Sequence, residues 1–149
     1  MKFAAFKEGM VITHPPVVVG EEEMLAFSKR YDPQWFHTDP QRAQEGRWEG
    51  LIGSGWMTCA LAMRMLVDVA LHDSEVFGSP GVEDLRWLKP VRPGDALRME
   101  TTVLSVRRSS SRPELGILKW TWRLFDQHDE AVLELTATSL FDLADKPQA

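Results

Sequence analysis

Apolar and polar residues alternate along three stretches in the second half of the chain, at residues 97–103, 118–124 and 133–137. A period of two predicts strands with one buried face and one solvent-exposed face, as in an antiparallel sheet. A fourth and less regular strand is predicted at 82–89. Segments rich in Pro, Gly, Ser and Asp predict the connecting turns, at 90–95, 109–116 and 126–130.

A long apolar run precedes these strands. Residues 54–72 are apolar or small on almost every side, except at Arg64 and Asp68. A helix that is hydrophobic all round is buried, and one of this length spans about 27 Å. We therefore expect the rest of the chain to wrap around this helix.

The first third of the chain predicts one or two edge strands and two helices. Residues 10–19 are rich in β-branched side chains but contain two successive prolines, which favours an edge strand. Residues 21–31 have acids in the first turn and bases in the last, as a helix prefers. An Asp-Pro pair favours a short helix over 39–44, with Asp39 as its N-cap. Together these elements indicate an α+β domain, with an antiparallel sheet wrapped around a buried central helix.

The segment YDPQWFHTDP, residues 31–40, carries the main candidate chemistry. Asp32 and His37 are five positions apart, which on a helix would place them about 140° apart on different faces. Pro33 disfavours helical backbone at Asp32, so we expect an irregular turn in which both side chains converge. A carboxylate and an imidazole that share a water are a common arrangement for acid–base catalysis. The same residues also have a purely structural interpretation, because Asp before Pro commonly starts a turn.

Length and composition narrow the class of protein. The 149 residues fit one domain, 1–149, with a core at about 9–143 and a frayed tail at 144–149. The net charge of −5 argues against nucleic acid or an anionic membrane as the main partner. A single cysteine, Cys59, excludes an intrachain disulfide and a thiolate metal cluster. No apolar run has the length of a signal-peptide core followed by a cleavage site, or of a membrane span, so a soluble cytoplasmic protein is expected.

With these elements in place, the chain resembles the MaoC-like dehydratases, the family of R-specific enoyl-CoA hydratases. The family's catalytic segment reads roughly D-x-N-P-x-H, and residues 32–37 keep its acid-to-imidazole spacing. Residues 50–58, GLIGSGWMT, resemble the glycine-containing turn that opens the family's central helix. Residues 81–97 resemble its strand-turn-strand segment, and the similarity covers about 9–143. The resemblance implies a hot-dog fold and a hydro-lyase of fatty acid metabolism, which adds or removes water at the double bond of an α,β-unsaturated acyl-CoA.

The resemblance also implies residue roles. Asp32 is expected to act as the base toward water and His37 to position the water and relay the proton, in an order that the sequence leaves open. The backbone N–H of Gly55 is expected to bind the thioester carbonyl oxygen, because a glycine at a helix start lets a ligand approach the backbone. A glycine needed only for packing is the alternative. Further substrate contacts are expected from Gln34, Ser54 and Trp56. No metal and no cofactor are expected, since CoA or an acyl-carrier thioester is part of the substrate.

Three positions depart from the family pattern. Gln34 and Trp35 stand where the hydratases have Asn and Pro, and Met63 falls near a serine that many of them carry. Two alternatives therefore stay open. One is a hot-dog acyl-CoA thioesterase, which generally has a carboxylate near the start of the central helix, where residues 54–63 contain none. The other is a non-catalytic subunit that binds acyl thioesters.

The acyl pocket is expected to be apolar and sized for a short-to-medium chain. The substrate tail would run along the central helix, past Trp56, Met57, Met63 and Met65, while Trp35 and Trp56 close the near end. The histidines at 14, 72 and 128 have no metal-ligand spacing. A sheet edge and an incomplete pocket predict a homodimer or an assembly of dimers.

Overall fold

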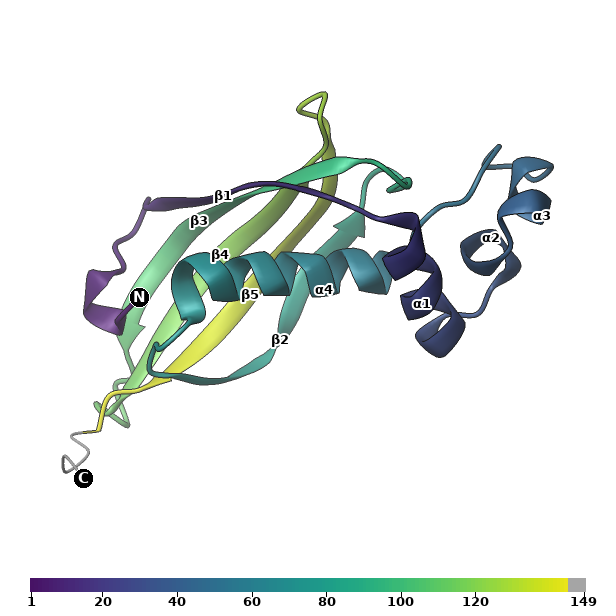
Figure 1. Ribbon diagram of the computed structural model, residues 1–149. Helices are drawn as coiled ribbons and strands as arrows, with labels where there is room; N and C mark the ends of the chain where they lie inside the picture. The colour runs from purple at the N-terminus through teal and green to yellow at the C-terminus, as the bar shows by residue number, and fades with distance from the viewer. Residues whose placement is uncertain (145–149) are drawn as a thin grey trace.

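The computed structural model of the chain describes residues 1–144, and the predicted tail beyond Ala144 lies outside the described residues. Five antiparallel strands form one sheet in the order β1-β3-β4-β5-β2. The sheet curves around the central helix α4, and three short helices stand beyond one end of it (Figure 1). The elements are, in chain order, η1 (Phe3–Ala5), β1 (Val11–Val18), α1 (Glu21–Tyr31), α2 (Trp35–Thr38), α3 (Pro40–Gln44), α4 (Gly55–Leu66), η2 (Val67–Leu71), β2 (Val76–Trp87), β3 (Ala96–Arg108), β4 (Leu115–Phe125) and β5 (Ala131–Asp142).

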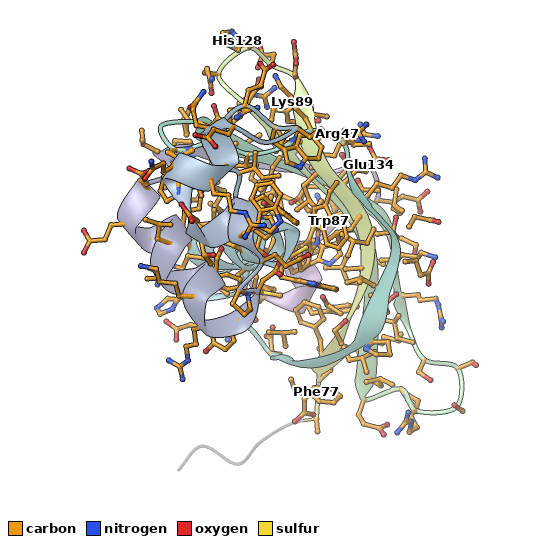
Figure 2. All side chains as sticks on the ribbon, turned by 90° about the vertical axis from the view of Figure 1, so that its right-hand side faces the viewer. Arg47, Phe77, Trp87, Lys89, His128 and Glu134 are labelled. Carbon is orange, nitrogen blue, oxygen red and sulfur yellow. The ribbon has the colours of Figure 1, made fainter. Side chains whose placement is uncertain are left out.

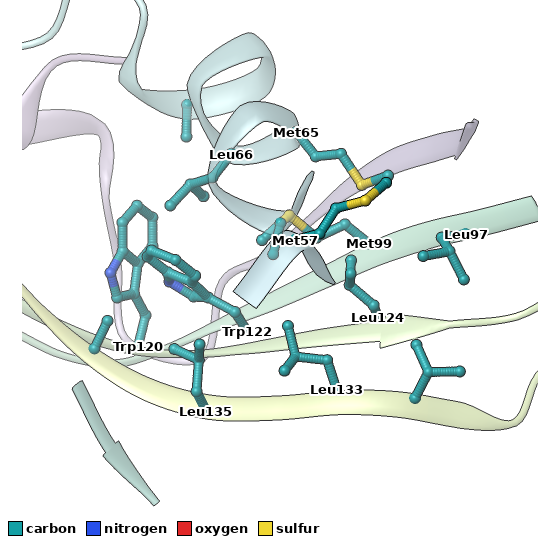
Figure 3. Close-up of a cluster of buried hydrophobic side chains, with 14 of the residues drawn as sticks. Met57, Met65, Leu66, Leu97, Met99, Trp120, Trp122, Leu124, Leu133 and Leu135 are labelled. Atoms are coloured by element: carbon teal, nitrogen blue, oxygen red, sulfur yellow. The ribbon is translucent and has the colours of Figure 1, made fainter. Parts of the chain in front are cut away.

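The three alternating strands are confirmed, and so are the turns between them. Every apolar position of the predicted pattern in β3, β4 and β5 is buried, and these side chains pack against α4 (Figure 3). Trp120 and Trp122 belong to this core, as expected, and their rings meet edge to face at 6.1 Å. The period of two therefore gives the sheet one dry face, which is the face turned toward the helix.

The central helix is confirmed, but the prediction that it is buried all round is wrong. Helix α4 continues into the π-helical turn η2, and Met57, Met65 and Leu66 are buried against the sheet. Trp56 and Met63 are 59% and 42% exposed, because the sheet covers only one side of the helix. The chain therefore supplies only part of the covering that an all-apolar helix requires.

Strand β2 begins six residues before the predicted strand. It pairs with β5 at the edge of the sheet, and its register shifts three times between Val76 and Arg86. Gly78, Pro80 and Gly81 lie in this irregular part and remove the alternation that identifies a strand in sequence. An edge strand tolerates such residues because one of its sides has no ladder partner.

The short helices depend on Pro33. Helix α1 ends at Tyr31, as predicted, since Pro33 cannot continue it. The expectation of a wholly irregular segment after Asp32 is wrong, because the chain turns at Pro33 and forms the single helical turn α2, which contains His37. Helix α3 follows as predicted, and the Asp39 carboxylate caps it by accepting a hydrogen bond from the Arg42 N–H at 3.0 Å.

The packed core includes Phe3 and Phe6, which lie before the predicted core boundary at about residue 9. Phe6 meets Trp120 edge to face at 5.6 Å, and Phe3 lies 5.2 Å from Phe141. The N-terminal segment is therefore part of the domain. Over residues 1–144, no helix is long and apolar enough to cross a membrane.

The packing of α4 on the sheet predicts a large cost for a truncated side chain. Leu66 is 0% exposed, and Leu66→Ala should lower the free energy of unfolding by about 2–5 kcal/mol, since it removes buried methyl groups and leaves a cavity. Leu104 on β3 is 41% exposed and gives a matched control, whose replacement by Ala should cost less than about 1 kcal/mol. Urea unfolding followed by circular dichroism measures both, and equal losses would contradict this packing.

Candidate functional site

Asp32 and His37 come together at the end of the molecule where the short helices meet the start of α4. Asp32 is the C-cap of α1, and its N–H donates to Ser28 O at 2.9 Å. His37 lies in α2 and is 6% exposed. The break at Pro33 turns the chain so that Asp32 Oδ2 lies 3.4 Å from His37 Nε2. The Asp32 and His37 side chains converge as expected, although His37 lies in the helical turn α2.

The hydrogen bond of the other ring nitrogen fixes the tautomer of His37. Nδ1 lies 2.7 Å from the backbone oxygen of Ile52. A carbonyl oxygen only accepts hydrogen bonds, so we assign the proton to Nδ1. In the neutral imidazole Nε2 then carries the lone pair, and it faces the Asp32 carboxylate. Their separation is longer than the roughly 2.7–2.9 Å of a direct charge-assisted hydrogen bond.

Hydrogen bonds hold both oxygens of the Asp32 carboxylate. Gln34 Nε2 donates to Oδ1 at 2.8 Å, and the Ser54 hydroxyl donates to Oδ2 at 2.7 Å. Burial raises the pKa of Asp32, but the bonds from Ser54 and Gln34 and the nearby His37 outweigh burial and leave that pKa below its ordinary value. The carboxylate is therefore ionised near neutral pH.

Ser54 connects this carboxylate to the central helix. Its hydroxyl also accepts a hydrogen bond from the Trp56 N–H at 3.3 Å, so Ser54 is the N-cap of α4. The Gly55 N–H is at the first helical position, where the helix supplies no acceptor, and none of residues 1–144 accepts a hydrogen bond from it. One donor therefore remains available beside the Asp32–His37 pair.

The absence of a side chain at Gly55 has a packing reason, as the alternative interpretation of this glycine expected. A Cβ at this position would lie 2.5 Å from Cε2 of Trp87, so the indole occupies the space that a side chain would need. The Trp87 indole N–H donates to the Gly55 carbonyl at 2.8 Å. Trp87 also meets Trp56 edge to face at 5.2 Å. Trp87 thus holds the first turn of α4 from the end of β2, on the side turned toward the short helices (Figure 2).

A cavity of about 510 Å³ contains this arrangement. Of the predicted site residues, Asp32, Gln34, His37, Gly55 and Trp56 line it, while Ser54 supports it from behind through Asp32. Residues that the sequence did not single out for the site complete the wall, among them Trp48, Thr58, Trp87 and Leu88.

The expectations for the acyl pocket are corrected at three positions. Met57 and Met65 are 3% and 2% exposed and belong to the core, because helical periodicity turns them toward the sheet. Trp35 packs on Gly46 and lies under the Arg42 guanidinium at 4.7 Å, and it is not part of the cavity wall.

Lys89 lies in the wall of the cavity but is already paired with carboxylates. Its ammonium contacts Asp126 at 2.6 Å and Glu130 at 2.5 Å. The hydrogen bond from Lys89 lowers the pKa of Asp126 to about 2, against the opposing effect of burial and with help from the N–H groups of Glu130 and His128. This ion pair fixes the turn between β4 and β5 beside the site, and Figure 2 shows Lys89 near that turn. In residues 1–144, no group of three or more His, Cys, Asp or Glu side chains is arranged to hold a metal ion.

The contact between Trp87 and Gly55 predicts energetic coupling. Gly55→Ala should destabilise the protein, because the new methyl group must displace the indole. The same change in a Trp87→Ala background should cost far less, and the two losses should be non-additive by about 0.5–3 kcal/mol in a double-mutant cycle.

Urea unfolding of the four proteins measures this coupling. Gly78→Ala is the matched control, because a Cβ there meets nothing within 4 Å. Additive losses from the two substitutions would show that Trp87 does not restrict residue 55.

Comparison with known proteins identifies the family. The model of the MaoC like domain matches residues 3–117. The crystal structure of the MaoC-like dehydratase from Rhodospirillum rubrum aligns with a TM-score of 0.85 and 34% identity, and the match covers 97% of each chain. The uncharacterized protein YdeM of Bacillus subtilis is 28% identical over 134 residues, 90% of this chain and 94% of YdeM.

A more distant relative is the mesaconyl-CoA hydratase of Haloarcula marismortui, 25% identical over 124 residues. The match covers 79% of this chain and 33% of that protein, so this chain spans about a third of the relative's length. The family match covers most of the chain, and the solved structure shares its arrangement of one sheet around one helix. The chain belongs to the MaoC-like family of hydratases and dehydratases and has the hot-dog fold.

Proposed function

We propose that this protein adds water to, or removes it from, the double bond of an α,β-unsaturated acyl-CoA thioester, with R stereochemistry as the family suggests. The observation that carries the proposal is the pair of acceptors in the cavity. Asp32 Oδ2 and His37 Nε2 lie 3.4 Å apart in the cavity that Gly55 also lines, and the Gly55 N–H has no acceptor among residues 1–144. One water between two acceptors and one nearby backbone donor are the parts that this reaction requires.

In the proposed hydration step, one water donates one hydrogen to each acceptor. Its oxygen lone pair then points away from both and toward the β-carbon. The water oxygen bonds to the β-carbon while His37 Nε2 takes a proton, and the double-bond electrons move toward the thioester oxygen. Asp32 holds the other hydrogen and stabilises the imidazolium by its charge. The lowered pKa of Asp32 favours this role over proton uptake, which differs from the expectation that Asp32 is the base.

The resulting enolate needs a donor at its oxygen and a proton at its α-carbon. The Gly55 N–H, at the positive end of α4, is proposed to bind the oxygen. The imidazolium of His37 then gives its proton to the α-carbon and returns to its neutral form. Dehydration follows the same steps in reverse.

The proposed assembly is a homodimer built on β2. This edge strand exposes Val82 at 50%, and Val82 lines one cavity together with the exposed Trp56 and Met63 of α4. A second copy paired along β2 would cover both the strand edge and the apolar side of the helix.

Substitution of the two acceptors tests the reaction. Asp32→Asn and His37→Gln should each lower kcat for an enoyl-CoA by about 10²- to 10⁴-fold, because each removes an acceptor for the water. Loss of the enoyl-thioester absorbance measures turnover. Gln is chosen at the buried position 37 because it keeps a donor for Ile52 O.

Two conservative changes outside the cavity serve as controls. Asp39→Asn keeps a good N-cap for α3, and His72→Gln changes an imidazole that is 77% exposed. Near-parental turnover in Asp32→Asn or His37→Gln would refute the assignment. Release of free thiol without loss of the double bond would instead identify a thioesterase, and binding of the thioester without either change would identify a non-catalytic subunit.

The pKa of Asp32 tests whether the Ser54 hydroxyl stabilises the ionised carboxylate. Ser54→Ala removes a hydrogen bond that lowers the pKa of Asp32 while burial, which raises it, remains. The titration midpoint of the Asp32 carboxyl carbon, followed by NMR, should therefore move to higher pH in this variant. Thr38→Ala is the matched control, because its hydroxyl donates to Gln34 O at 3.1 Å rather than to Asp32. An unmoved midpoint in Ser54→Ala, or one moved to lower pH, would contradict this role.

The oligomeric state tests the assembly. Val82→Lys places a charge on the proposed interface and should shift the protein toward the monomer. Val11→Lys on β1 is matched in chemistry and in exposure, 53% against 50%, and should leave the dimer intact. Light scattering after gel filtration measures both, and a parental protein that is only a folded monomer would refute the dimer.

A further inference from the structure

The structure has a second cavity, open to the surface, that the reaction described above does not use. It has a volume of about 680 Å³ and lies between the exposed side of α4 and the edge strand β2. Met63, Val67 and Leu71 line it from the helical side, and Val82 and Leu85 line it from β2. No charged side chain is part of its wall among the described residues. Burial raises the pKa of Cys59, which keeps this thiol of the wall neutral.

A single side chain separates the two cavities. Trp56 is the one described residue in the walls of both the catalytic cavity and the apolar cavity. Its indole meets the Trp87 indole edge to face, at 5.2 Å and 80°. Trp87 is in turn fixed to the Gly55 carbonyl. The partition is therefore anchored at the helix start where the thioester oxygen is proposed to bind.

This geometry limits the length of a bound acyl chain. We place the tail of a substrate held at Gly55 along α4, toward Trp56 and the apolar cavity. The indole of Trp56 then stands directly in its path. A short tail ends before the indole, whereas a longer one reaches the apolar cavity only if Trp56 leaves Trp87.

We propose that Trp56 sets the acyl chain length of the substrate by separating the catalytic cavity from an apolar cavity for longer aliphatic chains. The proposal rests on the proposed hydration of acyl thioesters. In the parental protein, short chains are preferred. Removal of the Trp56 indole joins the two cavities, and the added methylenes of a longer chain then become buried.

The experiment compares kcat/KM for straight-chain enoyl-CoAs of about 4 to 12 carbons, a range that spans several methylenes of burial. Trp56→Ala should raise the ratio of long-chain to short-chain kcat/KM by about tenfold or more for each two added methylenes that become buried. Trp56→Phe keeps an aromatic ring against Trp87 and should retain the parental ratio. Adding Met63→Trp to Trp56→Ala refills the apolar cavity and should reverse the gain.

Trp48→Ala controls for a general loss of bulk. Trp48 lines the catalytic cavity but not the apolar one, and its backbone oxygen, which accepts from Arg92 at 2.6 Å, is kept. This variant should not change the chain-length ratio. An equal gain in Trp48→Ala, or no gain in Trp56→Ala, overturns the role of Trp56.

A binding measurement separates this proposal from the proposed function. Calorimetric titration with saturated butyryl-CoA and decanoyl-CoA requires no turnover, and Trp56→Ala should tighten decanoyl-CoA relative to butyryl-CoA. If no enoyl-CoA is hydrated but this relative tightening occurs, the hydration is wrong and the partition is right. If hydration occurs while both ratios stay parental, the partition is wrong and the hydration stands.

Discussion

The hydrogen bond from the Ser54 hydroxyl to Asp32, 2.7 Å long, joins the two chain segments on which the site depends. One segment is the break after α1, where Pro33 prevents the helix from continuing. The other is the start of α4, where Ser54 also caps the helix through the Trp56 N–H. The Ser54 hydroxyl both donates to Asp32 and accepts from the Trp56 N–H. The position of the carboxylate and the position of the first turn of α4 are therefore coupled. Loss of the hydroxyl would release both at once.

The central helix places a second constraint on the molecule. An α-helix that is apolar on all sides requires cover on all sides, but a curved five-stranded sheet can cover only the side that faces it. Met57 and Leu66 meet the sheet, while Trp56 and Met63 do not. The uncovered side is the side from which the apolar cavity opens, next to β2. The proposed interface and the proposed acyl site therefore both use the apolar surface of α4 that the sheet does not cover.

Local patterns predicted the elements well, because they depend on residues close in sequence. The alternation in β3 to β5 and the charge distribution of α1 were sufficient to place those elements correctly. The start of β2 was missed, since glycines and a proline remove its alternation and only pairing with β5 makes it a strand. The exposed side of α4 was missed for a related reason. The hydrophobicity of a residue indicates that its side chain favours burial. It does not indicate whether the same chain or a second copy buries that side chain.

Gly55 shows that a packing role and a proposed binding role can fall on one residue. In the sequence, a glycine at the start of a helix indicated that a ligand approaches the backbone. In the structure, the missing side chain makes room for Trp87, which comes from a strand 32 residues further along the chain. The indole then bonds to the Gly55 carbonyl and supports Trp56 by edge-to-face contact. Within residues 1–144, one glycine therefore both leaves a backbone N–H without an acceptor at the cavity around Asp32 and His37 and admits the tryptophan that packs against Trp56.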